Sequence, residues 1–195
     1  YKNVLLIGAD KMSSIVDYED RATCIIFGDG AGAVLFEASD SDFGWEDEYL
    51  RSDGSGRKYL NIKAGGSLLP TSRLTVENKM HNLYQDGKTV FKYAVSRMSD
   101  ATEQIIKRNK IDPKKIAYLV PHQANSRIID ATAKRINLPT EKVMRNIEKY
   151  GNTTAATLPL LLKDYEKKLR PGDKLIFAAF GGGFTWGAAY LTWSY

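Results

Sequence analysis

The chain has 195 residues, of which 43% are hydrophobic, and its formal net charge is +5. That length can bury one large core or two small ones. No apolar run approaches the roughly 20 residues that span a bilayer, and no dense basic run alternates with aromatic residues, so we expect neither membrane nor nucleic-acid binding. The single cysteine excludes an internal disulfide framework and is typical of a reducing cytoplasm.

The first third of the chain predicts strands followed by irregular segments. Residues 3–8 are a short apolar run closed by glycine, which predicts a buried strand. Residues 22–27 and 33–37 predict strands on either side of a glycine-rich turn. Residues 39–57 are acidic and rich in glycine and serine, which predicts a segment that crosses between two halves of the fold. Residues 58–86 predict an elaborated surface excursion.

From Thr89 onward, helical and strand patterns alternate. In chain order we expect a helix from Thr89 that stops at Asp112-Pro113, a strand over 116–120, helices over 128–136 and 158–165, and strands over 174–180 and 186–193. Residues 143–147 fit a helix and a strand equally well. Strands that alternate with helices imply a layered α/β architecture.

Two polar side chains stand where such a fold would gather a ligand. His122 follows Pro121 directly after a predicted strand, and ligands of open α/β sheets bind at the carboxyl ends of strands. A lone histidine is by default a core residue, but an imidazole here can donate through Nε2 to a thioester oxygen or act as a base. Asn152, by default a turn residue after Gly151, can donate its amide to the same developing negative charge.

Two glycine clusters have different interpretations. Gly181-Gly182-Gly183 predicts either a tight hairpin turn or a loop that brings a backbone N–H close to a reacting carbonyl. The run over 28–32 lacks the dinucleotide spacing, because its third glycine comes one residue too early, and we interpret it as a structural bend.

No residue of the chain is a convincing nucleophile. Cys24 lies in an apolar run without a basic neighbour, which predicts a buried core thiol. His81 lies in the polar excursion and receives no role. We therefore expect the attacking residue to lie upstream of Tyr1, and we expect no metal site.

The motifs together resemble the β-ketoacyl-acyl-carrier-protein synthase III family, and the resemblance covers nearly the whole chain. In chain order they are Gly8-Ala9-Asp10-Lys11, Phe27-Gly28-Asp29-Gly30-Ala31-Gly32-Ala33, Pro121-His122-Gln123-Ala124-Asn125, Tyr150-Gly151-Asn152-Thr153 and Phe180-Gly181-Gly182-Gly183-Phe184-Thr185-Trp186-Gly187. The resemblance implies a thiolase-like α/β fold with layers αβαβα. Residues 1–38 would be the last strands of the N-terminal half, and 39–195 the C-terminal half.

The resemblance also implies the chemistry. His122 and Asn152 match the second and third members of a Cys-His-Asn triad, whereas Cys24 does not match the first. The implied reaction is the initiating condensation of type II fatty acid synthesis, in which an acyl group moves from coenzyme A to the cysteine and then condenses with malonyl-acyl carrier protein as carbon dioxide leaves. His122 and Asn152 would stabilise the enolate, and Gly181 and Gly182 would form the oxyanion loop. Without its cysteine, this chain alone is expected to be inactive.

Ligand contacts follow from the same resemblance. It assigns Gln123 and Arg127 to acyl carrier protein and Arg21, Gly87, Phe91 and Asn125 to coenzyme A and its pantetheine arm. It implies a cytoplasmic homodimer without a cofactor, coenzyme A entering as the thioester substrate. Two alternatives stay open: a related acyltransferase or polyketide-type synthase, and a non-catalytic dimerisation half.

Overall fold

The computed structural model describes all 195 residues and is built around a four-stranded sheet. In the order of the sheet, its strands are β3 (Gly44–Ser52), β8 (Thr185–Thr192), β7 (Lys174–Gly181) and β6 (Ile116–Pro121). β6 and β7 are parallel, and the other neighbouring pairs are antiparallel. The carboxyl ends of β6 and β7 therefore lie at the same edge of the sheet.

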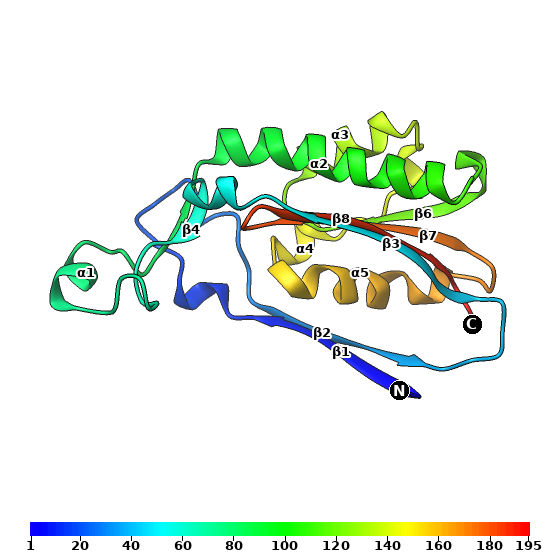
Figure 1. Cartoon of the computed structure of the whole chain (residues 1–195), viewed down its shortest axis with the longest axis horizontal. Coiled ribbons are helices and arrows are strands. Elements are labelled where there is room, and N and C mark those ends of the chain that lie inside the picture. The colour runs from blue at the N-terminus through cyan, green and yellow to red at the C-terminus, as the bar shows by residue number, and fades with distance from the viewer.

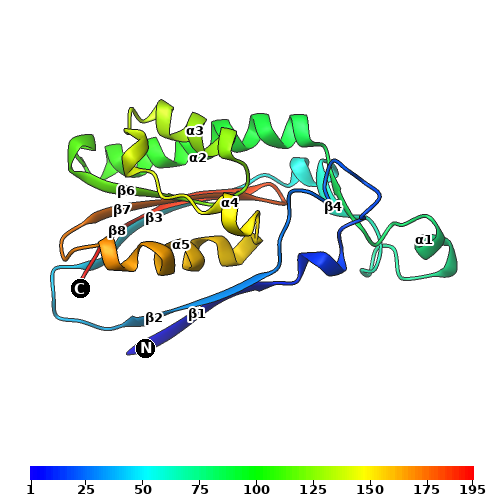
Figure 2. The same ribbon diagram turned by 180° about the vertical axis from the view of Figure 1, so that it is seen from behind.

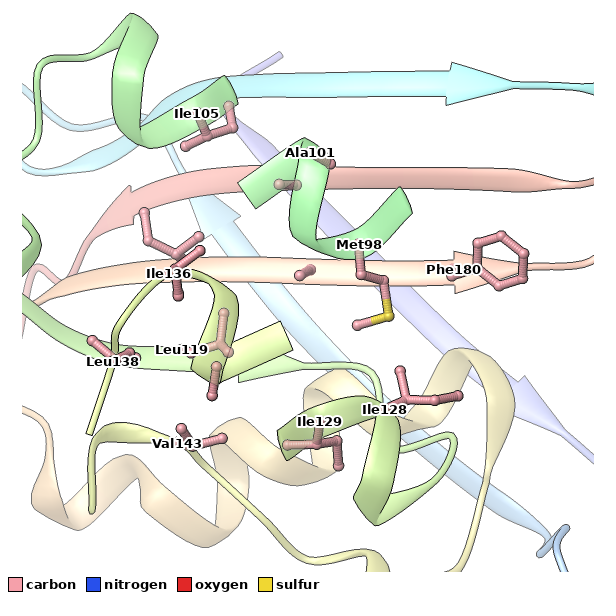
Figure 3. Packing of buried hydrophobic residues seen from close by; sticks show 14 of the residues in the cluster. Met98, Ala101, Ile105, Leu119, Ile128, Ile129, Ile136, Leu138, Val143 and Phe180 are labelled. Carbon is pink, nitrogen blue, oxygen red and sulfur yellow. The ribbon is translucent and has the colours of Figure 1, made fainter. Parts of the chain in front are cut away.

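Helices α2 (Gly87–Arg108) and α3 (Ser126–Arg135) cover one face of this sheet (Figure 1). Met98, Ala101 and Ile105 of α2 are fully buried and recur at helical spacing, so one stripe of the helix faces the strands. Figure 3 shows Ile128 and Ile129 of α3 packed in the same apolar cluster. This cluster is the largest core of the chain.

The opposite face of the sheet is covered by α4 (Ile147–Tyr150) and α5 (Thr157–Tyr165). Beyond α5 lies a second, two-stranded sheet made of β1 (Asn3–Asp10) and β2 (Gly30–Glu37). Figure 2 shows the resulting order of layers as helix, sheet, helix and sheet. The layered α/β fold expected from the sequence is confirmed.

A segment that extends away from the layers confirms the excursion predicted over 58–86. It contains β4 (Leu60–Ile62), α1 (Arg73–Glu77) and β5 (Leu83–Gln85), with α1 at its outer end (Figure 1). The helices of the structure include none whose length and apolar character would let it cross a membrane.

Several local predictions need correction. Residues 3–7, expected in a buried strand, lie in β1 but are exposed, and Gly30 to Gly32, expected in a turn or bend, lie in β2. Residues 22–26 form turns rather than a strand, and only Phe27 makes an isolated bridge, to Asn152. Cys24 is half-buried rather than a core thiol. The segment interpreted as a crossing contains β3, an edge strand whose Asp47 accepts hydrogen bonds from Arg108 of α2. Acidic residues of this kind are disfavoured in isolated strands, so only the pairing with β8 reveals it.

Candidate active site

His122 stands at the carboxyl edge of the main sheet, as the sequence predicts. It follows β6 directly, and its backbone N–H donates to the carbonyl of Ala178 in β7 at 2.8 Å. Because β6 and β7 are parallel, Gly181 at the end of β7 lies at the same edge. The histidine and the glycine loop are thereby brought together from segments far apart in the chain.

The surroundings of His122 keep its ring neutral. Nδ1 lies 2.7 Å from Oγ1 of Thr157, whereas Nε2 has no hydrogen-bond partner within the chain. The ring keeps some exposed surface at a cavity wall, but the atoms packed around it remove enough water for burial to lower the pKa of His122 to about 4. At neutral pH the imidazole is uncharged.

Asn152 is held from both sides by backbone hydrogen bonds. Its N–H donates to the carbonyl of Ile26 at 3.0 Å, and its own carbonyl accepts from the N–H of Gly28 at 2.9 Å. Its side-chain Oδ1 accepts from the N–H of Thr154 at 2.9 Å. With the oxygen of the amide used in this way, the NH₂ group is left as a donor.

The loop that carries Asn152 is fastened to the first strand of the chain. Thr154 has a left-handed backbone with φ of 49°, which is uncommon for a β-branched residue. The carboxylate of Asp10, at the end of β1, accepts from Oγ1 of Thr154 and, at 3.1 Å, from the N–H of Ala155. These bonds offset the backbone strain and fix the orientation of Asn152.

The glycine triplet contains one position that demands glycine and two that do not. Gly183 has φ of +137°, a conformation that other residues rarely adopt. A Cβ at Gly182 would come no nearer than 3.8 Å to Leu60, which is ordinary contact. The small residues at 181 and 182 therefore leave open space at the cavity rather than relieving a clash within the chain.

A cavity of about 1780 Å³ joins these groups. It lies against the ends of β6 and β7, the start of α2 and the inner side of the β1–β2 sheet. Its lining includes, among the predicted site residues, His122, Asn152, Gly181, Gly182, Gly87, Phe91, Asn125 and Arg127. The exposed guanidinium of Arg127 lies over the ring of Phe91, with the two centres 5.2 Å apart. The wall carries no cluster of three or more His, Cys, Asp or Glu side chains that could hold a metal ion.

Two predicted contacts differ from expectation. Gln123 is fully buried, its Nε2 donating to the carbonyl of Pro121 at 2.8 Å and its Oε1 accepting from the N–H of Asn146 at 3.1 Å. The amide of Gln123 is thus engaged within the protein, so the structure does not support a side-chain contact between Gln123 and acyl carrier protein. Arg21 is exposed but lies outside the cavity wall.

Sequence reasoning missed Thr157 and Asp10. Thr157 is 35 positions from His122, and Asp10 is 144 positions from Thr154, so no local pattern connects either residue to the site. The only available signal for Asp10 was its place in the first motif of the family resemblance. Asn125 lines the cavity, but its Oδ1 caps α3 by accepting from the N–H of Arg127 at 2.9 Å.

The layered sheets, with His122 and the glycine loop at the ends of β6 and β7 and Asn152 on the loop after α4, define a thiolase-like fold, and comparisons with known proteins agree. The family model described as 3-oxoacyl-[acyl-carrier-protein] synthase III matches residues 1–54, and the model of its C-terminal part matches residues 106–193. The β-ketoacyl-[acyl-carrier-protein] synthase III of Phocaeicola vulgatus is 58% identical over all of this chain and 58% of its own length. That of Chlorobaculum tepidum is 53% identical over 98% of this chain and 60% of its own.

Solved structures give the same result. The enzyme of this name from Thermus thermophilus has a TM-score of 0.89 at 41% identity, over 99% of this chain and 60% of its own. A priming β-ketosynthase from the R1128 polyketide pathway has a TM-score of 0.85 at 29% identity, over 99% of this chain and 57% of its own. The chain belongs to the β-ketoacyl-[acyl-carrier-protein] synthase III family and spans about 58% of the length of its curated relatives.

Proposed function

We propose that this chain supplies the histidine and asparagine of a Cys-His-Asn active site that catalyses the initiating condensation of fatty acid synthesis. The observation that supports it most strongly is the convergence on one cavity of a neutral imidazole, a free amide donor and an open glycine loop. The cysteine of the triad would come from a part of the protein outside these 195 residues. No cofactor is needed, because the coenzyme A thioester is itself a substrate.

The roles divide between covalent and electrostatic catalysis. An acyl group moves from coenzyme A to the cysteine thiol, which splits one condensation into two acyl transfers. Malonyl-acyl carrier protein then loses carbon dioxide, and the enolate oxygen that develops is stabilised by His122 and Asn152. The carbanion attacks the acyl-cysteine, whose oxyanion receives a backbone N–H from the loop at Gly181 and Gly182.

The proposal includes a division of the chain. Residues 1–38 would be the last strands of an N-terminal half, and 39–195 the C-terminal half with His122 and Asn152. The separation of β1 and β2 into their own sheet supports this division. Assembly into a homodimer belongs to the same proposal, and sedimentation of the purified protein tests it.

The decisive experiment combines this chain with a polypeptide that contains the part of the relatives' length that it does not match. With acetyl-coenzyme A and malonyl-acyl carrier protein, we expect condensation from the pair and none from the chain alone. His122→Ala and Asn152→Ala should abolish the product, whereas Cys24→Ala, the control, should not. Loss of activity in Cys24→Ala would contradict a nucleophile outside this chain. If the two polypeptides together are inactive, the result would favour the alternative that this chain is a non-catalytic dimerisation half.

A polyketide-type synthase is the second candidate, because the R1128 priming ketosynthase shares the fold at 29% identity. The same assay separates the two functions when acetyl-coenzyme A is replaced by longer or branched primers. A strong preference for a primer that fatty acid synthesis does not use would support the second candidate.

Docking of the acidic acyl carrier protein is proposed at Arg127, an exposed residue of the cavity wall. Long-range attraction to a basic side chain raises association rates more than it changes chemistry. Arg127→Glu in the assembled enzyme should raise the KM for malonyl-acyl carrier protein and spare acyl transfer from coenzyme A. Lys134→Glu, the same charge change at the far end of α3, is the control. Equal losses with both substrates would contradict docking.

A further inference from the structure

We propose that Thr157 is a positioning residue whose hydroxyl donates to Nδ1 of His122 and so keeps the ring proton on Nε2, facing the cavity. This inference rests on the proposed function and assigns to that site a residue outside its triad. It begins from the contact of 2.7 Å between the two side chains. A neutral imidazole carries one proton, and the partner of one nitrogen decides where that proton lies.

The hydroxyl of Thr157 has one proton and two acceptors within reach. The first is Nδ1 of His122 at 2.7 Å, and the second is the carbonyl oxygen of Thr154 at 3.0 Å. That carbonyl already accepts the backbone N–H of Thr157, whereas no other donor approaches Nδ1. With its proton on Nδ1, the ring would instead donate to the hydroxyl, which would donate to the carbonyl of Thr154, so these contacts accommodate both tautomers. The choice between the two tautomers follows from what Nε2 must do in the proposed site.

The opposite tautomer would work against the site. With its proton on Nδ1, His122 would present the lone pair of Nε2 to the oxygen toward which Asn152 donates. The lone pair of Nε2 and the N–H donor of Asn152 would then face the same developing negative charge. With the proton on Nε2, both side chains act as neutral donors, which is the arrangement that stabilises an enolate.

The location of Thr157 suits a positioning role. It is only 2% exposed, begins α5, and as a β-branched residue has few side-chain rotamers. Oδ1 of Asn152 binds the N–H of Thr154 in the same short segment. One segment, 152–157, thus orients the amide of Asn152 and the imidazole of His122 together.

The test is nitrogen-15 spectroscopy of the histidine rings in the 195-residue chain at neutral pH. The chain has two histidines, so His81→Gln assigns the signals by elimination. We expect Nε2 of His122 to show the shift of a protonated nitrogen and Nδ1 that of an unprotonated, hydrogen-bonded one. The reverse pattern overturns the proposal, and the measurement requires no catalysis, so it is independent of whether the proposed function holds.

Two variants test the hydroxyl itself. Thr157→Val keeps the shape and removes the donor, so we expect the Nδ1 and Nε2 shifts to move toward each other as both tautomers become populated. Thr157→Ser keeps the donor and should retain the wild-type pattern. An unchanged pattern in Thr157→Val overturns the role of the hydroxyl, as does a wild-type His122 that already shows mixed tautomers. Circular dichroism of each variant reports whether it is folded.

Discussion

The two sheets of this chain have similarly apolar strands but very different surroundings. Leu119 of β6 is 0% exposed because helices cover both faces of the main sheet, whereas Leu5 and Ile7 of β1 are 60% and 65% exposed. A two-stranded sheet is marginal by itself, so β1 and β2 depend on what packs against their inner face. Apolar composition predicts a strand, but the layers around it decide how much that strand stabilises the fold.

Glycines make the inner contact of the β1–β2 sheet possible. A Cβ at Gly8 would lie 2.5 Å from the carbonyl oxygen of Ala155, and one at Gly32 would lie 2.8 Å from Pro159 of α5. These short distances explain the glycine-rich run over 28–32 as close packing of one layer on the next, not as a nucleotide loop. The same approach brings Asp10 to the loop of Asn152.

The largest expected effect on the free energy of unfolding comes from one of a matched pair of leucine truncations, one in each sheet. Leu119→Ala removes fully buried methyl groups and should lower the free energy of unfolding by about 2–5 kcal/mol. Leu5→Ala should change it by no more than about 0.5 kcal/mol, as for exposed sites. Urea denaturation followed by circular dichroism measures both. Equal losses would mean that the outer face of β1 is covered in solution.

A smaller effect is expected where the two sheets meet through α5 and the loop before it. Gly8→Ala places a methyl group against backbone that cannot rotate away, and should cost about 1–3 kcal/mol. Gly66→Ala is the control, since a Cβ there meets nothing within 4 Å. The same denaturation experiment applies. A Gly8→Ala protein as stable as the control would show that β1 does not pack closely on this loop.

A pH-dependent effect should appear on acidification, at the cavity between the sheets. Burial lowers the pKa of His122 from 6.5 to about 4, so between these values the unfolded chain binds more protons than the folded one. Stability contributed by His122 is therefore present above pH 6.5 and is lost as the pH falls toward 4. His122→Gln should show a weaker decline over this window. Parallel stability–pH curves for the two proteins would contradict a buried neutral ring.

Much of the site was predictable from local rules. His122 was singled out because it directly follows a predicted strand, and the glycine triplet because a tight turn or a close backbone approach favours glycine. Local rules did not show that Gln123, although it adjoins His122, faces the protein interior. Sequence adjacency indicates the neighbourhood of a side chain but not its direction.

The sequence by itself determined the α/β class, the helix and strand order from residue 89 onward and the family, because apolar periodicity and short motifs are local properties. Only the tertiary structure decided that β3 completes the main sheet, that Asp10 secures the loop of Asn152 and that Thr157 contacts His122. Each of these contacts joins residues far apart in the chain. Such pairs form only when the layers stack, since the geometry of packing, not the local pattern, sets which polar groups meet.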